Sequence, residues 1–90
     1  MQRTRFVIDY SSEAKENIKT FPKNIQKRIT DAINERLTVA PDEYGEPLRK
    51  QWKSHRRLRV GDYRVIYKVY EEKVVVFIVD IDHRRDVYDD

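Results

Sequence analysis

The first half of the chain carries apolar residues at the spacings of one strand and two helices. Residues 4–10 place Phe6 and Ile8 among polar neighbours, which predicts a strand, and Ser11 or Ser12 can cap a short helix over about 12–20. Phe21-Pro22 then breaks that helix. Five apolar residues on one stripe predict a second helix, which should end near 39–40, before Pro41. They are Ile25, Ile29, Ala32, Ile33 and Leu37.

From Leu48 onward the pattern changes to strands. Gly61-Asp62 and Glu71-Glu72 are candidate tight turns, which predicts a meander of three antiparallel strands. The last strand, 74–81, is continuously apolar, as expected of a strand covered on both faces. Residues 41–47 hold Gly45 between two prolines and are predicted to form a loop. The expected fold class is α+β, in the order β-α-α-β-β-β, with two N-terminal helices on one face of a small, mostly antiparallel sheet.

A two-residue turn at Gly61-Asp62 also fixes the register of the hairpin around it. Arg59 then lies opposite Arg64, and His55 opposite Lys68, on the face that carries Arg57 and Ile66. The other face is apolar and carries Leu58, Val60, Tyr63, Val65 and Tyr67. One face is therefore predicted to join the core and the other to be cationic. Arg56 falls on the apolar face and is expected at the sheet edge, over Tyr67.

Length and composition narrow the class of protein. A chain of 90 residues supports one hydrophobic core, so residues 1–90 are expected to form a single domain. Hydrophobic and charged residues each make up 39% of the chain, which leaves little apolar surface for a deep pocket. The absence of cysteine excludes disulfides and thiolate ligands. With no apolar stretch long enough for a signal peptide or a membrane span, we expect a soluble, cytoplasmic protein.

The positive charge is concentrated in one segment, residues 48–68. That segment holds eight basic residues and a single acidic one, Asp62, whereas the chain as a whole carries only +3. Such a block favours a site for a polyanion, since a merely solubilising surface mixes its charges. The alternative is an ordinary solvated face. The eight residues are Arg49, Lys50, Lys53, Arg56, Arg57, Arg59, Arg64 and Lys68.

Two segments form distinctive motifs. The first runs from His55 to Tyr67, His-Arg-Arg-Leu-Arg-Val-Gly-Asp-Tyr-Arg-Val-Ile-Tyr, and the second is the basic-aromatic tail from Asp82 to Tyr88. Together they resemble the RelE/ParE superfamily of bacterial and archaeal toxins. With the preceding strand and helices, the resemblance covers nearly the whole chain. It implies a RelE-like microbial ribonuclease fold. The Arg-Leu-Arg-x-Gly-Asp-Tyr-Arg motif indicates the superfamily without separating its activities.

The RelE branch of the superfamily implies a metal-independent ribonuclease that cuts messenger RNA in the ribosomal A site, with no cofactor. In the implied reaction a 2′-hydroxyl attacks the neighbouring phosphate, which requires a base, cations for the charge on phosphorus, and an acid. By position in the motifs, the resemblance assigns catalytic roles to His55, Arg57, Arg64, Arg84 and Tyr88. We expect the other basic residues to contact RNA or the ribosome. These are Arg49, Lys50, Lys53, Arg56, Arg59, Lys68, His83 and Arg85.

Each catalytic assignment has a simpler alternative. Facing arginines repel, so Arg57 and Arg64 suit a phosphate between them, but they can also be solvated or paired with the acidic tail. His55 is either the base or an incidental surface histidine. Arg84 either clamps the phosphate or pairs with neighbouring aspartates. Tyr88 either stacks on a base or packs the terminus onto the sheet.

The identity of the base is left open by the sequence. Some relatives have lysines where this chain has His55 and Arg57, and arginine is a poor base because it hardly deprotonates. His83 is a second candidate, since some relatives use a histidine close to the C-terminus.

Three functions compete at this stage. The first is the ribosome-dependent nuclease, held inactive by a cognate antitoxin protein from a neighbouring gene. The second is a ParE-like gyrase inhibitor on the same fold, which does no RNA chemistry; fold alone does not separate the two. The third is a non-toxic RNA-binding domain. The expected convergence of His55, Arg57, Arg64, Arg84 and Tyr88 on one face favours the nuclease.

Overall fold

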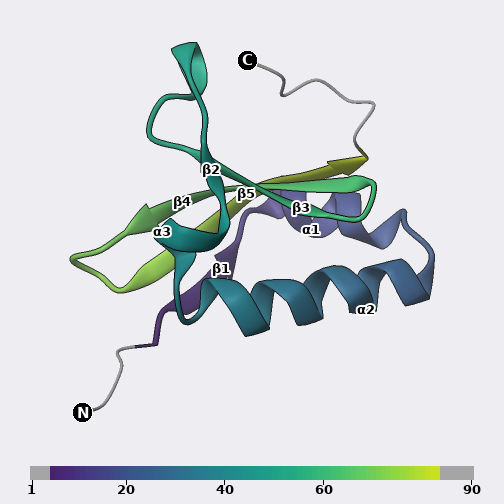
Figure 1. Cartoon of the computed structure of the whole chain (residues 1–90). Helices are drawn as coiled ribbons and strands as arrows, with labels where there is room; N and C mark the ends of the chain where they lie inside the picture. Colours follow the sequence, from purple (N-terminus) through teal and green to yellow (C-terminus); the bar gives the residue numbers. More distant parts are fainter. Residues whose placement is uncertain (1–4, 84–90) are drawn as a thin grey trace.

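The fold is a five-stranded sheet with its helices packed against it, seen in a computed structural model that describes residues 5–83 (Figure 1). Its strand order is β1-β5-β4-β3-β2. The strands are β1 (Val7–Tyr10), β2 (Glu46–Pro47), β3 (Arg56–Val60), β4 (Tyr63–Tyr70) and β5 (Val75–His83). The helices are α1 (Ser12–Lys19), α2 (Lys23–Ala32) and α3 (Pro41–Tyr44), with a π-helical turn at Ile33–Leu37 and a 3-10 turn at Lys50–Trp52. The expected α+β class is confirmed.

The predicted antiparallel meander is formed by β3, β4 and β5. Gly61, with φ of 60°, and Asp62 make the two-residue turn, and the predicted register is confirmed from Val60↔Tyr63 to Arg56↔Tyr67. β1 adds to the far side of β5 in parallel, with Val7 opposite Val75. β5 is therefore an interior strand, as its apolar sequence predicted, although its outer face is only half covered at Phe77.

The helices are positioned by a cap and by one apolar stripe. Ser11 caps α1 by accepting a hydrogen bond from the Ala14 backbone N–H at 3.0 Å. α2 runs directly into the π-helical turn, so the helical path reaches Leu37, close to the predicted end. Its apolar stripe is buried against the helix-facing side of the sheet. The fully buried residues in this core include Ala14, Ile29, Ile33, Leu37, Val65, Tyr67, Val76, Ile78 and Ile81.

Residues 41–47 were predicted to form a loop, and this prediction is wrong. They fold into α3 and β2, and β2 pairs with β3 through Glu46↔Arg57 and Pro47↔Arg56. Tertiary contacts hold them in place. The Tyr67 hydroxyl donates to the Pro41 carbonyl oxygen at 2.5 Å, and the Arg56 guanidinium donates to the Gly45 carbonyl oxygen and, at 2.9 Å, to that of Asp42.

Two smaller predictions also need correction. β3 begins at Arg56, so His55 precedes the strand and has no register partner at Lys68. The turn after β4 spans 71–74 instead of two residues, and it requires φ of 57° at Val74. Within the described residues, no helix is long and apolar enough to cross a membrane.

Candidate functional site

Three of the predicted site residues gather on the sheet face opposite the core. Arg57 and Arg59 alternate along β3, and Arg64 lies directly across from Arg59 on β4. We call these three residues the arginine face. Arg59 is exposed, whereas the Arg57 side chain is only 13% exposed. The predicted group of arginines is therefore present, and its three side chains differ in how far they are buried.

Arg64 is more buried than its sequence position suggested. It was expected to lie outside the core, but only 8% of the residue is exposed. The cause is its place on β4, the middle strand of the sheet, with Arg59 on one side and Asp82 on the other. The neighbouring position on the same face, Ile66, is fully buried. This face is thus a partly covered surface and not a freely solvated one.

Acidic residues stand beside the arginines. Glu46 is the cross-strand partner of Arg57, and its Oε1 accepts a hydrogen bond from Arg57 Nη2 at 2.9 Å. This contact holds the pKa of the Glu46 carboxyl below its ordinary value. Asp82 occupies the corresponding position beside Arg64. Sequence reasoning missed Glu46, because the pairing of β2 with β3 has no signal in a two-residue segment.

His55 lies at the entrance to β3. It is half-buried, and its imidazole meets the Trp52 ring edge-on with centroids 5.3 Å apart. Backbone hydrogen bonds fix it on both sides: its N–H donates to the Trp52 carbonyl, and its carbonyl accepts from the Leu48 N–H. An open pocket of about 230 Å³ beside it is lined also by Asp42, Pro47, Ser54, Arg56, Val69 and Glu71.

His83, the second candidate base, belongs to the other side of the sheet. It pairs with Tyr63, and the two rings meet edge-on at 5.1 Å. Tyr63 in turn contacts Phe21 at 4.7 Å and packs against the core. His83 is therefore separated by the sheet from the arginine face.

Arg56, predicted to bind RNA, also points away from the arginine face. It lies beside Tyr67, as the register predicted, and its guanidinium is committed to the carbonyl oxygens of 42 and 45. Burial raises the pKa of the Tyr67 hydroxyl, and the nearby guanidinium opposes that shift. In the described part of the chain, Arg56 is therefore engaged in hydrogen bonds that stabilise the fold.

Other residues that were predicted to contact RNA or the ribosome lie outside the arginine face. Arg49, Lys50 and Lys53 are exposed in the segment between β2 and β3, which projects beyond the sheet on the side away from α2 (Figure 1). Lys68 is half-buried, and its Nζ lies 5.2 Å from the centroid of the Tyr70 ring. Three predicted residues, Arg84, Arg85 and Tyr88, lie outside the described residues.

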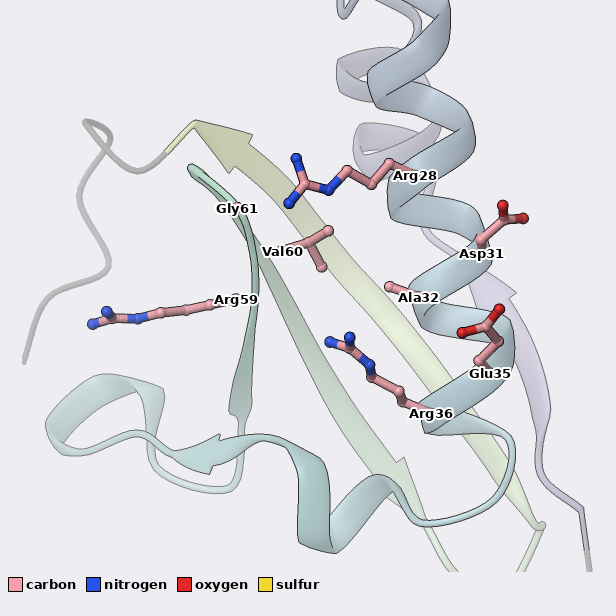
Figure 2. Close-up of a pocket in the computed structure, with 8 residues that line it drawn as sticks. All are labelled: Arg28, Asp31, Ala32, Glu35, Arg36, Arg59, Val60 and Gly61. Carbon is pink, nitrogen blue, oxygen red and sulfur yellow. The ribbon is translucent and has the colours of Figure 1, made fainter.

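A second basic region was not predicted. An open cleft of about 350 Å³ lies between α2 and β3, and Figure 2 shows Arg28 and Arg36 extending into it from the helical segment. Asp31 and Glu35 line it farther from β3, and Arg59 points to the opposite side of β3. The signal for this cleft was the spacing of Arg28 and Arg36, eight residues apart with Ala32 midway, which places them on one helical face.

Comparison with known proteins shows that this fold occurs in a class of small toxins. The structure superposes on the toxin–antitoxin complex RelBE2 of Mycobacterium tuberculosis with a TM-score of 0.87, at 25% identity, over 94% of this chain and 98% of that one. The isolated RelE toxin of E. coli has the same fold, with a TM-score of 0.74 at 18% identity, over 92% and 88% of the two chains. A curated relative, Toxin RelG of M. tuberculosis, is 26% identical over 83 residues, or 92% of this chain and 95% of its own.

The family assignment rests on the sequence itself. Residues 8–88 match the family described as the ParE toxin of type II toxin–antitoxin systems. The chain belongs to this family, within the RelE/ParE toxin superfamily.

Proposed function

We propose that this protein is a ribosome-dependent endoribonuclease that cuts messenger RNA in the ribosomal A site. The observation that carries the proposal is the arginine face: Arg59 and Arg64 face each other across the hairpin, with Arg57 on the same side. Like charges in cross-strand positions are unfavourable unless an anion lies between them. Guanidinium groups are suited to that anion being a phosphate, because they donate to two oxygens at once.

The proposed reaction needs only proton transfers and charge stabilisation. A base removes the proton of a 2′-hydroxyl, the 2′-oxygen attacks phosphorus, and the bond from phosphorus to the 5′-oxygen breaks. The leaving oxygen takes a proton from an acid, which gives a 2′,3′-cyclic phosphate and a 5′-hydroxyl. Arg57 and Arg64 would stabilise the charge that develops on the phosphoryl oxygens.

The remaining roles in the reaction are assigned from position in the chain and from the family resemblance. His55 is the preferred base, because it precedes β3 directly and belongs to the same segment as Arg57. His83 is less suited, since it packs with Tyr63 on the core side. Arg84 and Tyr88 keep the roles that the family resemblance implies, a phosphate clamp and an acid or stacking residue.

The proposed partners are the ribosome with its messenger RNA and a cognate antitoxin. The antitoxin proposal is supported by one similar structure reported above, the toxin–antitoxin complex RelBE2 of M. tuberculosis. In the free toxin the arginine face would be available to RNA in the cytoplasm, and a bound antitoxin would cover it. Exposed Arg49, Lys50 and Lys53 supply further contacts to RNA or ribosome.

A second candidate function is inhibition of DNA gyrase. It is favoured by the ParE family match, which covers residues 8–88. Such an activity would use the same fold as a binding module, with no need for a base or an acid.

The test is primer extension on a reporter messenger RNA in a reconstituted translation reaction. Wild type is compared with Arg57→Ala, with Lys23→Ala as a control that removes one exposed positive charge from α2, and with a reaction lacking ribosomes. Ribosome-dependent cuts in the coding region that are lost only in Arg57→Ala support the proposal. Intact message with continued translation contradicts it, and loss of gyrase supercoiling in a parallel assay would establish the second candidate. Normal growth on expression without a partner would indicate a non-toxic RNA-binding domain.

A further inference from the structure

The outer face of the sheet, opposite the core, has a hollow where β4 ends and β5 begins. We call it the aromatic hollow; it is open, has a volume of about 290 Å³, and is lined by Asp9, Tyr70, Lys73, Val75 and Phe77. Side chains alternate along β4, so Tyr70 lies on the same face as Arg64, six residues away, or about 20 Å. The aromatic hollow and the arginine face are therefore two parts of one surface.

Aromatic and aliphatic side chains supply the apolar part of the hollow. Tyr70 is exposed, and Phe77 is only half-buried although it lies on an interior strand. Val7, which pairs with Val75 in the register, is 63% exposed. Exposed apolar side chains that adjoin one another mark a binding surface. Aromatic rings on such a surface can stack on the bases of single-stranded nucleic acid.

Positive groups stand at the rim of the hollow. The Nζ atoms of Lys68 and Lys73 lie 5.2 Å and 5.9 Å from the centroid of the Tyr70 ring. Neither lysine forms an ion pair with an acid among residues 5–83. Lys68 also lies on the part of β4 that leads toward Arg64. Two ammonium groups without acidic partners, beside exposed aromatic rings, favour a ligand that combines a flat ring with a phosphate.

One acid lies within the same hollow. Asp9 pairs with Phe77 in the parallel register of β1 and β5, and its side chain is exposed. It forms no ion pair in the described part of the chain. A carboxylate beside an aromatic ring can accept a hydrogen bond from an amino group on the edge of a stacked base.

We propose that the aromatic hollow is a subsite for one nucleotide of single-stranded RNA. The base packs on Phe77 beside Tyr70, and the phosphates next to it pair with Lys68 and Lys73. The subsite rests on the proposed function in one respect: the nucleotide belongs to the RNA strand whose phosphate the arginine face holds. A second copy of the chain fits less well, because a two-fold contact would bring the lysines of both copies together.

Asp9 gives this subsite a preference among bases. Cytosine has an amino group, N4, that can donate to the carboxylate, whereas uracil has a carbonyl oxygen, O4, at the same place and repels it. The two rings have the same size, so stacking on Phe77 differs little between them. The subsite therefore favours a base with an exocyclic amino group and disfavours uracil.

The test measures the binding of two labelled octanucleotides, octacytidylate and octauridylate, to the full chain without ribosomes. Both carry 2′-O-methyl groups and so lack the attacking hydroxyl. Fluorescence polarisation gives their Kd values. We expect wild type to bind octacytidylate about threefold tighter or more. Asp9→Asn should remove this preference, because an amide can donate to the uracil carbonyl, whereas Glu13→Gln, at an exposed acid of α1, should keep it.

A second pair of variants tests stacking. Tyr70→Ala should weaken the binding of both octanucleotides about fivefold or more. Tyr44→Ala is the matched control, since it removes another exposed tyrosine, from α3, and should change little. Circular dichroism confirms that each variant folds.

Equal losses in Tyr70→Ala and Tyr44→Ala, or a preference for octacytidylate that survives Asp9→Asn, would overturn the subsite. So would sedimentation that shows a wild-type dimer dissociated by Tyr70→Ala while RNA binding is unchanged, which would assign the hollow to a contact between two copies. Primer extension keeps this result apart from the proposed function. A wild type that cuts no message but binds the octanucleotides as expected would overturn the nuclease and leave the subsite intact.

Discussion

Gly45 lies directly against Tyr67: a Cβ on Gly45 would stand 2.1 Å from the Tyr67 hydroxyl oxygen and 2.8 Å from its Cζ. Tyr67 is fully buried and donates its hydroxyl hydrogen to the Pro41 carbonyl oxygen. Only a residue without a side chain lets the backbone approach the ring this closely. One residue later Glu46 begins β2 and reaches Arg57. The contact between Gly45 and Tyr67 therefore helps to set the acid beside the arginine face.

We predict that Gly45→Ala lowers the free energy of unfolding by about 1–3 kcal/mol, because the new methyl group overlaps a fully buried ring. Urea unfolding measures this. Tyr67→Phe in the same background removes the closest atom and should recover part of the loss, although Tyr67→Phe alone costs stability through the lost hydrogen bond. Strictly additive effects of the two substitutions would contradict the proposed clash.

The predictable part of the fold is the part governed by local periodicity. The stripe through Ile29, Ile33 and Leu37 and the two-residue turn at Gly61-Asp62 are local signals, and both were confirmed. α3 and β2 were missed because they depend on distant contacts. The hydrogen bond from Tyr67 to Pro41 joins residues 26 positions apart, and no sequence pattern within 41–47 predicts it.

The candidate site divides in the same way. Alternation along a strand predicted that Arg57, Arg59 and Arg64 share one face, and the register confirms it. The burial of Arg64 was not predictable, because it depends on which strands flank β4. The acid beside Arg57 was missed for the same reason, since Glu46 comes from a separate strand.

The two facing arginines should differ in their effect on stability. We predict that Arg59→Ala changes the free energy of unfolding by less than about 0.5 kcal/mol, because Arg59 is exposed. Arg64→Ala should cost about 1–3 kcal/mol, because it removes a buried group from its polar neighbours. Chemical denaturation compares them, and circular dichroism confirms that each variant folds. Under the proposed function both should cut messenger RNA at least tenfold more slowly; a stable Arg59→Ala with full activity would remove that residue from the site.

β5 extends beyond its last residue paired with β1, and there α1 contacts it through a hydrogen bond from Asn17 to Asp80. We predict that this contact stabilises the fold. Asp80 is 5% exposed, and its Oδ1 accepts from Asn17 Nδ2 at 2.6 Å and from the Ile81 N–H at 2.9 Å. Asp80→Ala leaves these donors without that acceptor, so we expect a loss of about 1–3 kcal/mol. Asp80→Asn keeps an acceptor oxygen and should lose less. Hydrogen exchange at the Ile81 amide supplies the second measurement: it should speed up in Asp80→Ala, and unchanged exchange would show that the carboxylate does not protect this edge.

The ion pair between Glu46 and Arg57 should give stability a defined dependence on pH. The contact lowers the pKa of the Glu46 carboxyl in the folded state, below the ordinary 4.5. Its contribution is therefore fully present above the unfolded pKa and is lost as the pH falls through the folded value. Glu46→Gln should be slightly less stable than wild type at neutral pH, and the two stabilities should converge as the pH falls below the folded-state pKa of Glu46. Glu43→Gln, in α3, controls for the loss of one exposed carboxylate. Thermal unfolding across pH 3–7 measures the difference, and a gap between wild type and Glu46→Gln that persisted at pH 3 would assign the effect to packing instead of charge.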